Sequence, residues 1–315
     1  MRLGRFGGLL VWWMTVVRLG AADAALDLPG WLLTAEQWAQ GNLDPRVLRV
    51  LERVDQERVR RLFVELQGRF QGEYVVDLAA LRQTAMALQP LLELHPETRP
   101  YGVWLKTRLD YFEIAEQFRL SVPPVKVVPG QPSPEVPRVN PGPEVERRVW
   151  REQIAKRPEP RGAGALVPRL KRVFAAEKVP PELVWLAEVE SSFDARARSP
   201  AGAAGLFQLM PGTARGLGLS LRPVDQRLDP ELSARAAARY LRELYGRFRN
   251  WHLAVAAYNA GEGTIQRALE RNKAKAFDRI AGRLPAETQL YVPKVEATLL
   301  RREGVGLGQL RAAGR

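Results

Sequence analysis

The sequence predicts an all-α protein made of two helical parts. Apolar residues recur at helical spacing in both parts, and no segment alternates apolar and polar residues in the way of a half-buried strand. A proline-rich stretch, which cannot be helical, separates the two parts. At 315 residues, the chain is long enough for two domains with a sizeable core.

Residues 1–24 have the pattern of a secretory signal peptide. A basic start precedes an apolar run over residues 6–17, and residues 22–24 form a cleavage site of the A-x-A type. The run is shorter than the roughly 20 residues of a transmembrane helix. Arg18 follows it, so an uncleaved anchor is the alternative. We expect export to the periplasm, with membrane attachment only where the signal stays uncleaved.

Residues 25–120 are expected to form a helical N-terminal region of roughly three long helices, over 45–67, 73–92 and 97–120. The helices carry leucine and aromatic residues at helical spacing, which favours a packed core over a binding surface. Nothing in this pattern indicates chemistry. The role of the region stays open, and an envelope protein that binds it is one candidate partner.

Residues 121–143 hold eight prolines and are expected to form an extended linker, at which we place the domain boundary. Helices then resume in a second domain over 144–305, before a flexible tail over 306–315. Cap and breaker residues bound them; Asp229 before Pro230, for example, is a predicted N-cap. The expected helices are 144–157, 164–177, 181–192, 211–216, 230–248, 251–259, 263–271, 276–280 and 286–302.

The charge and the composition restrict the partners. A net charge of +13 favours an anionic partner. Without cysteine the chain has no disulfide and no thiolate metal site, and with His95 and His252 as its two histidines it cannot build a three-histidine zinc site. We expect no metal and no cofactor. Because the chain is expected to be exported, the predicted partner is a bacterial envelope polymer that carries peptide carboxylates. Nucleic acid is not expected as a partner.

One carboxylate stands where a core residue is expected. At about 100° per residue, Leu183, Leu186 and Ala187 share a helix face with Glu190, while Glu188 points to the other side. Desolvation on an apolar face raises the pKa of a carboxyl group. Such a group can donate a proton near neutral pH. We therefore predict that Glu190 is a general acid.

Four blocks carry a resemblance to a known family. They are ESSFD at 190–194, SPAGAAGLFQLMPGTA at 199–214, AAYNAGEG at 256–263 and ETQLYVPK at 287–294. In this order and spacing the second domain resembles the lytic transglycosylase family, whose soluble-lysozyme-like catalytic domain cleaves peptidoglycan. The YVPK ending leans toward the membrane-bound lytic murein transglycosylase D group. The lipidation cysteine and LysM-like repeat of that group have no counterpart in the sequence.

The resemblance implies a role for six residues. Glu190 matches the sole catalytic acid/base, and Tyr258 matches the tyrosine whose hydroxyl approaches it. Ser199 is implied to touch the reacting sugar, Gln208 and Met210 to grip N-acetyl sugar, and Asn259 to serve a less defined role in the same motif. Four of the six have a purely structural alternative: a helix-end carboxylate for Glu190, a turn for Ser199, gap filling for Met210 and core packing for Tyr258.

Smaller features of the blocks have expectations of their own. Phe207 departs from the methionine common at its position, which we interpret as a conservative change in the pocket wall. Gly202 and Gly205 are expected to supply permissive backbone angles in a tight loop. Glu262 and Glu287 are expected to cap helices or form ion pairs rather than catalyse.

The expected mechanism follows from a missing second acid. Ordinary glycosidases use two carboxylates, and Glu188, Asp194, Asp225 and Asp229 are the candidates for the second. None is convincing, so the N-acetyl group of the substrate is expected to assist, leaving a 1,6-anhydromuramic acid end. A goose-type-lysozyme-like muramidase that uses water is one alternative. A non-catalytic wall-binding protein is the other.

Overall fold

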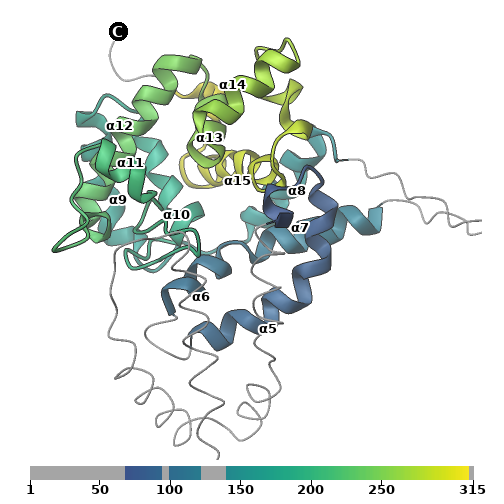
Figure 1. The fold of residues 1–315 in the computed structure, drawn as a ribbon, viewed down its shortest axis with the longest axis horizontal. Helices are drawn as coiled ribbons and strands as arrows, with labels where there is room; N and C mark the ends of the chain where they lie inside the picture. The colour runs from purple at the N-terminus through teal and green to yellow at the C-terminus, as the bar shows by residue number, and fades with distance from the viewer. Residues whose placement is uncertain (1–67, 94–98, 122–139, 312–315) are drawn as a thin grey trace, which may run out of the picture.

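The computed structural model describes residues 68–93, 99–121 and 140–311 (Figure 1). Over these residues the protein is all-α, and its β-type pairings are two isolated bridges around Ala204. The predicted fold class is therefore confirmed. The α-helices are α5 (Arg82–Glu93), α6 (Arg99–Lys106), α7 (Leu109–Ser121), α8 (Pro143–Ala155), α9 (Ala163–Ala176), α10 (Leu186–Ser191), α11 (Pro211–Gly216), α12 (Pro230–Phe248), α13 (Trp251–Ala260), α14 (Glu262–Arg271) and α15 (Ala286–Glu303).

Short 3₁₀ helices connect several of these elements. They are η1 (Val75–Leu81), η2 (Pro181–Trp185), η3 (Gln226–Leu228), η4 (Phe277–Arg279), η5 (Ala281–Arg283) and η6 (Leu307–Gln309). The predicted signal peptide, the predicted helix over 45–67 and residues 122–139 of the predicted linker lie outside the described residues. Of the helices that are described, none has the length and apolar character to cross a membrane.

The helix bounds after residue 143 follow the prediction closely. The helices over 211–216 and 230–248 have the predicted ends. Asp229 is the N-cap of α12, because its Oδ1 accepts from the main-chain nitrogens of Glu231 (2.9 Å) and Leu232 (2.8 Å). Two expected α-helices differ. The segment 276–280 contains the 3₁₀ helix η4, and the segment 181–192 is the 3₁₀ helix η2 followed by α10.

The N-terminal region has an aromatic core, as predicted. Phe70 packs edge-on against Trp104, at 6.5 Å between ring centroids, and against Tyr111, at 6.2 Å. Tyr111 also contacts Trp150 of α8, at 5.5 Å. The aromatic stripe of this region is therefore buried in packing contacts. Because Trp150 belongs to α8, the core of the N-terminal region continues into the segment that follows the linker.

The predicted helix over 97–120 is broken in the structure. It is divided into α6 and α7 by a turn at Thr107 and Arg108. The hydroxyl of Thr107 donates to the carbonyl of Trp104 at 2.7 Å, and the carbonyl of Thr107 accepts from the ammonium of Lys294 on α15. A side-chain bond to a nearby carbonyl competes with the helical ladder. The contact from Lys294 is tertiary, so helical periodicity could not predict this break.

Helix α15 lies at the centre of the described fold (Figure 1). It contacts α8, α10, α13, η1 and η2. Leu290 belongs to the N-terminal core, whereas Tyr291, Val292 and Val295 belong to the larger core built from α9 to α13. Helix α15 thus contributes side chains to both hydrophobic cores. The division into a region over 25–120 and a domain over 144–305 stays a prediction.

Candidate active site

Glu190 lies in the last turn of α10 and is buried, with 4% of its surface exposed. The helix ends one residue later, at Ser191, because Ser192 adopts the left-handed conformation (φ 53°). All six residues of α10 are buried, and η2 precedes it with a different pitch. The expected one-sided apolar stripe is therefore wrong in detail: the segment is enclosed on every side. The expectation that Glu190 sits in an apolar setting is confirmed.

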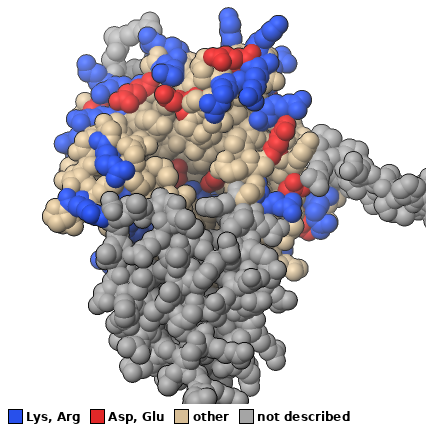
Figure 2. All heavy atoms as spheres, viewed as in Figure 1, with Lys and Arg blue, Asp and Glu red and all other residues tan. Residues whose placement is uncertain are grey.

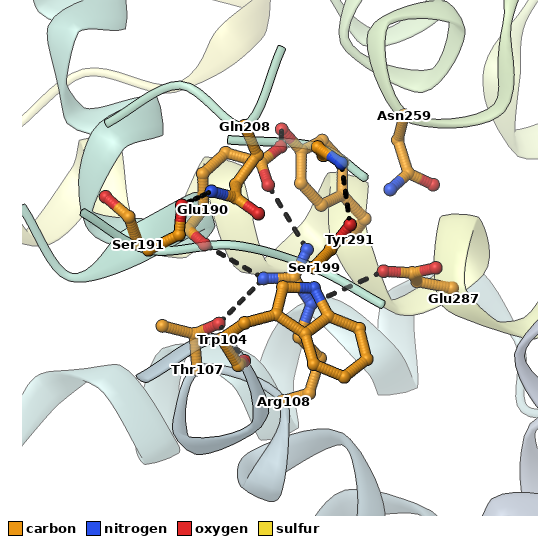
Figure 3. Close-up of polar contacts among 12 residues, drawn as sticks. Trp104, Thr107, Arg108, Glu190, Ser191, Ser199, Gln208, Asn259, Glu287 and Tyr291 are labelled. Atoms are coloured by element: carbon orange, nitrogen blue, oxygen red, sulfur yellow. Dashed lines mark hydrogen bonds and ion pairs between the residues drawn. The ribbon is translucent and has the colours of Figure 1, made fainter. Parts of the chain in front are cut away.

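Two side chains hold the carboxylate of Glu190 (Figure 3). The hydroxyl of Tyr291 donates to Oε1 at 2.7 Å. The Nη2 of Arg108 donates to Oε2 at 3.2 Å, and its Nη1 donates to the main-chain carbonyl of Glu190 at 2.9 Å. Each carboxylate oxygen thus has one partner, and the guanidinium also fixes the backbone of the same residue.

Arg108 comes from the turn between α6 and α7, and it is as buried as Glu190. Its Nη1 donates to the hydroxyl of Thr107 at 2.7 Å, and its guanidinium lies 5.2 Å from the ring centre of Trp104. On its far side, Nε lies 3.5 Å from Oε1 of Glu287 (Figure 3). The N-terminal region, whose sequence pattern indicated no chemistry, thus supplies the arginine that is bound to Glu190.

The surroundings set the acidity of Glu190. Burial raises the pKa of Glu190 above its ordinary value, and the nearby charge of Glu287 raises it further. The guanidinium of Arg108 and the hydrogen bond from Tyr291 oppose this rise. The raised pKa that the sequence predicted for Glu190 is confirmed in direction. Burial thus favours the protonated carboxyl group, while Arg108 and Tyr291 stabilise the anion that remains once the proton is released.

The loop after α10 folds back against it. Ser191 donates to the carbonyl of Leu206 at 2.9 Å, which ties the loop to the helix that carries Glu190. Gly205 has φ +84°, and a Cβ there would lie 1.9 Å from the carbonyl oxygen of Arg227, so a side chain has no room. Gly202 also has a positive φ. The predicted need for glycine at these two positions is confirmed.

Arg227 holds this loop in place through hydrogen bonds, a role that the sequence did not indicate. Its buried guanidinium donates to the carbonyls of Gly202 and Leu209, both at 2.8 Å. Asp225 holds the guanidinium in place through Nε (3.0 Å) and Nη2 (2.9 Å). The loop therefore has a fixed shape beside α10.

Three predicted substrate contacts belong to this loop. The hydroxyl of Ser199 is buried and accepts from the main-chain nitrogen of Ala203 at 2.9 Å. The Nε2 of Gln208 donates to two loop carbonyls, whereas its buried Oε1 has no hydrogen-bond partner. Met210 is 44% exposed at the start of α11. Phe207 is fully buried against Phe174, at 5.5 Å between ring centroids.

Tyr258 is close enough to Glu190 for the two to interact electrostatically, but its hydroxyl is bonded elsewhere. Its hydroxyl donates to the carbonyl of Phe207 at 2.7 Å, so the hydroxyl bonded to Glu190 is that of Tyr291. The ring of Tyr258 packs against Tyr240, at 5.4 Å between ring centroids. These contacts agree with the alternative that the ring of Tyr258 is part of the core. Tyr291 lies in the ETQLYVPK block, so the tyrosine that donates to Glu190 also belongs to one of the four family blocks.

Asn259 and Glu287 lie on the opposite side of the arginine from Glu190 (Figure 3). The Oδ1 of Asn259 accepts from the hydroxyl of Thr288, next to Glu287 in α15, at 2.7 Å. The expected ion pairing of Glu287 is confirmed by its contact with Arg108. Glu262 likewise pairs with Arg247, at 3.5 Å.

The four candidates for a second acid have other partners. Glu188 is paired with Arg302, and Asp225 with Arg227. Asp194 accepts from the main-chain nitrogen of Arg196 at 2.7 Å, and Asp229 caps α12. The carboxylate whose charge acts on Glu190 is instead Glu287, reached through Arg108.

Comparisons with known proteins agree with this site. The sequence model of the family described as "Transglycosylase SLT domain" matches residues 173–281, which include Glu190 and the loop after it. The chain is 46% identical over 123 residues to membrane-bound lytic murein transglycosylase D of Escherichia coli K12, which covers 38% of this chain and 27% of that protein. It is 35% identical over 139 residues to the soluble lytic murein transglycosylase of the same strain, covering 40% and 21%.

The chain spans about a quarter of the length of these two relatives. Among solved structures, the 70 kDa soluble lytic transglycosylase SLT70 of Escherichia coli matches 96% of this chain and 58% of that chain, with 21% identity and a TM-score of 0.42. Residues 173–281 of the chain match the Transglycosylase SLT domain, and over this part the chain is similar in sequence to lytic transglycosylases.

Proposed function

We propose that the protein is a peptidoglycan lytic transglycosylase that cleaves the β-1,4 bond between N-acetylmuramic acid and N-acetylglucosamine. The observation that supports this most is a single buried carboxyl group, Glu190, held by Tyr291 and Arg108 at the end of a helix inside the SLT domain. Its raised pKa suits a group that first donates a proton and then takes one back.

The reaction uses Glu190 twice. Protonated Glu190 donates to the glycosidic oxygen as the bond from that oxygen to C1 of the muramic acid breaks, and the carbonyl oxygen of the N-acetyl group bonds to C1. The resulting carboxylate then takes the proton of the C6 hydroxyl, whose oxygen attacks C1 and displaces the N-acetyl oxygen. Substrate assistance of this kind replaces a second carboxylate. The 1,6-anhydro ring closes without water, and Glu190 is protonated again.

The sugar contacts are part of the same proposal. Ser199, Gln208, Met210 and Asn259 are proposed to contact the N-acetyl sugars. The unpartnered, buried Oε1 of Gln208 is an acceptor that a sugar N–H or O–H could satisfy, and the exposed Met210 offers an apolar surface. Tyr258 is proposed to act indirectly, by holding the loop through Phe207.

The location and the partner are proposed with the activity. The apolar run before the A-x-A site supports export to the periplasm, and the excess of Lys and Arg, many of them visible in Figure 2, suits the carboxylates of peptidoglycan stem peptides. Membrane attachment is proposed only for protein with an uncleaved signal. N-terminal sequencing of the protein from a periplasmic fraction tests this, and a mature chain that begins near residue 25 is the expected result.

Product analysis tests the reaction. Digested peptidoglycan should contain anhydromuramic acid ends, lighter by one water than hydrolysed ends by mass spectrometry, and Glu190→Gln should release neither. Reducing ends would instead assign the protein as a muramidase. No release of either product by the wild type would assign it a wall-binding role.

A further inference from the structure

We propose that Arg108 is a positioning residue for this reaction: supplied by the N-terminal region, it orients the Glu190 carboxylate and neutralises it between the acid step and the base step. The inference rests on the proposed function and extends the site beyond the SLT domain, because Arg108 lies 65 positions before residue 173, where the family match begins.

The contacts of Glu190 with Arg108 and Tyr291 fix the orientation of its carboxyl group. Arg108 holds both Oε2 and the main-chain carbonyl of Glu190, while Tyr291 holds Oε1. The carboxyl group is thereby fixed at both oxygens and at its own backbone. A group that must reach first the glycosidic oxygen and then the C6 hydroxyl gains from a fixed position, because misplacement by about 1 Å can cost on the order of 100-fold in rate.

The neutralising role of Arg108 follows from its burial and from its place between the carboxylates of Glu190 and Glu287. Once Glu190 has donated its proton, its anion lies out of water, and a fixed positive charge there needs no reorganisation of solvent. Although burial opposes ionisation of Arg108, the neighbouring carboxylates raise the pKa of Arg108 above its ordinary value, so it stays charged. Glu287, 3.5 Å from Nε, offsets part of this charge. The arginine therefore stabilises the anion without preventing reprotonation.

The turn that carries Arg108 is itself held firmly. Lys294 of α15 contacts the carbonyl of Thr107 and donates to Asp110 at 3.0 Å. The buried Lys294 is fully enclosed, and its ammonium lies 4.5 Å from the ring centre of Tyr111. Helix α15 thus supplies Tyr291 and Glu287 to the site and fixes the turn that supplies Arg108. Such a supporting shell is what keeps a catalytic group in place.

The groups that interact electrostatically with Glu190 come from three elements around it. They are Arg108 from the α6–α7 turn, Tyr291 and Glu287 from α15, and Tyr258 from α13, while Tyr111 of α7 acts on Arg108. Among them the two charged groups have opposite effects on the proton of Glu190, which makes the proposal testable in two directions.

The experiment compares Arg108→Gln with Glu287→Gln in the full chain. Arg119→Gln, an exposed arginine of the same region that pairs with Glu116, is the matched control. Activity against short soluble glycan strands is measured from pH 4 to 9. In parallel, the carboxyl carbon of Glu190 is titrated by ¹³C NMR, with its resonance assigned from Glu190→Gln.

The two variants should move in opposite directions. Arg108→Gln should move the titration of Glu190, and the alkaline limb of kcat/KM, to higher pH, and lower kcat by ~100-fold with little change in KM, because the anion loses its counter-charge. Glu287→Gln should move both to lower pH. Arg108→Lys, which keeps the charge without the two-armed contact, should recover part of kcat, and Arg119→Gln should match the wild type.

The proposal fails if Arg108→Gln is more active than the wild type, because the arginine would then obstruct the reaction rather than support it. It also fails if Arg108→Gln and Glu287→Gln move the titration of Glu190 in the same direction or leave it unchanged. Should Arg108→Gln not fold, Arg108→Lys and Glu287→Gln still decide, since Glu287 contacts the site through Arg108. Because the NMR titration needs no turnover, it separates failure of this inference from failure of the proposed function.

Discussion

Helix α10 carries two buried glutamates two residues apart, and their surroundings differ. Both oxygens of Glu188 are held by a single arginine, with Nε and Nη2 of Arg302 each at 2.9 Å. The oxygens of Glu190 have separate partners, a guanidinium at 3.2 Å and a hydroxyl at 2.7 Å. A two-armed arginine pair satisfies both oxygens of a carboxylate with one cation. A shared arrangement that includes a neutral hydroxyl can accommodate both protonation states, so burial alone does not make a carboxylate catalytic.

A third buried glutamate completes the comparison. Glu146 of α8 is only 2% exposed, and its Oε1 has no hydrogen-bond partner. Burial raises the pKa of Glu146 to about 8. Three buried glutamates of the described part thus differ in what holds them: one arginine for Glu188, an arginine and a tyrosine for Glu190, and for Glu146 a setting that leaves Oε1 without a partner.

The largest effect is expected for Glu190→Gln. The change removes the acid and the base of the proposed reaction, so activity should fall by on the order of 10³-fold or more while the fold is kept. Anhydromuropeptide release and the circular dichroism spectrum check this. Activity within tenfold of the wild type would show that Glu190 is not the proton donor.

For Glu188→Gln, stability rather than chemistry should change. The variant leaves Arg302 buried with its charge unbalanced, which typically costs about 4 kcal/mol of unfolding free energy. Urea unfolding measures the loss, and activity per folded molecule should stay near that of the wild type. The contrast between the two glutamates breaks down if the catalytic rate of Glu188→Gln falls as far as that of Glu190→Gln.

Glu146→Gln should change the pH dependence of stability. Because its pKa is raised in the folded state, the unfolded chain releases this proton first, and stability falls as pH rises from about 4.5 to about 8. The variant lacks this fall, so it should match the wild type near pH 4 and exceed it by on the order of 5 kcal/mol above pH 8. Unfolding curves at both pH values test it, and equal differences at the two would contradict the assignment.

The smallest effects distinguish the two tyrosines. Tyr291→Phe removes a hydrogen bond that opposes the rise in the pKa of Glu190, so the alkaline limb of activity should move to higher pH and the rate should fall by ~10-fold. Tyr258→Phe should instead cost ~1 kcal/mol of stability, because the carbonyl of Phe207 loses its donor. A pH shift in Tyr258→Phe and none in Tyr291→Phe would restore the original assignment.

Local pattern was enough for part of the site. The Glu190 helix, the glycines of the following loop and the cap of α12 follow from burial, backbone freedom and side-chain capping, which act within a few residues. The helical class of the described residues follows from periodicity in the same way. These features are local, so sequence reasoning reached them.

The other part depends on contacts between distant segments. Arg108 reaches Glu190 across 82 positions, from a turn that Lys294 stabilises from 187 positions away. Nothing in the residues around Arg108 distinguishes it from a surface arginine on a long helix. Tyr291 and Tyr258 both stand in family blocks, and only the packing of α15 beside α10 decides which hydroxyl meets the carboxylate.

The place of α15 between two cores has a consequence for engineering. A truncated protein cut to the matched residues 173–281 would lose Tyr291, Glu287 and Arg108 together, although it would keep Glu190 and its loop. Grafting only that segment onto a carrier protein would therefore transfer the proposed proton donor without the side chains that contact it. The smallest transferable unit of this protein is set by α15 and the turn it supports, rather than by the limits of sequence similarity.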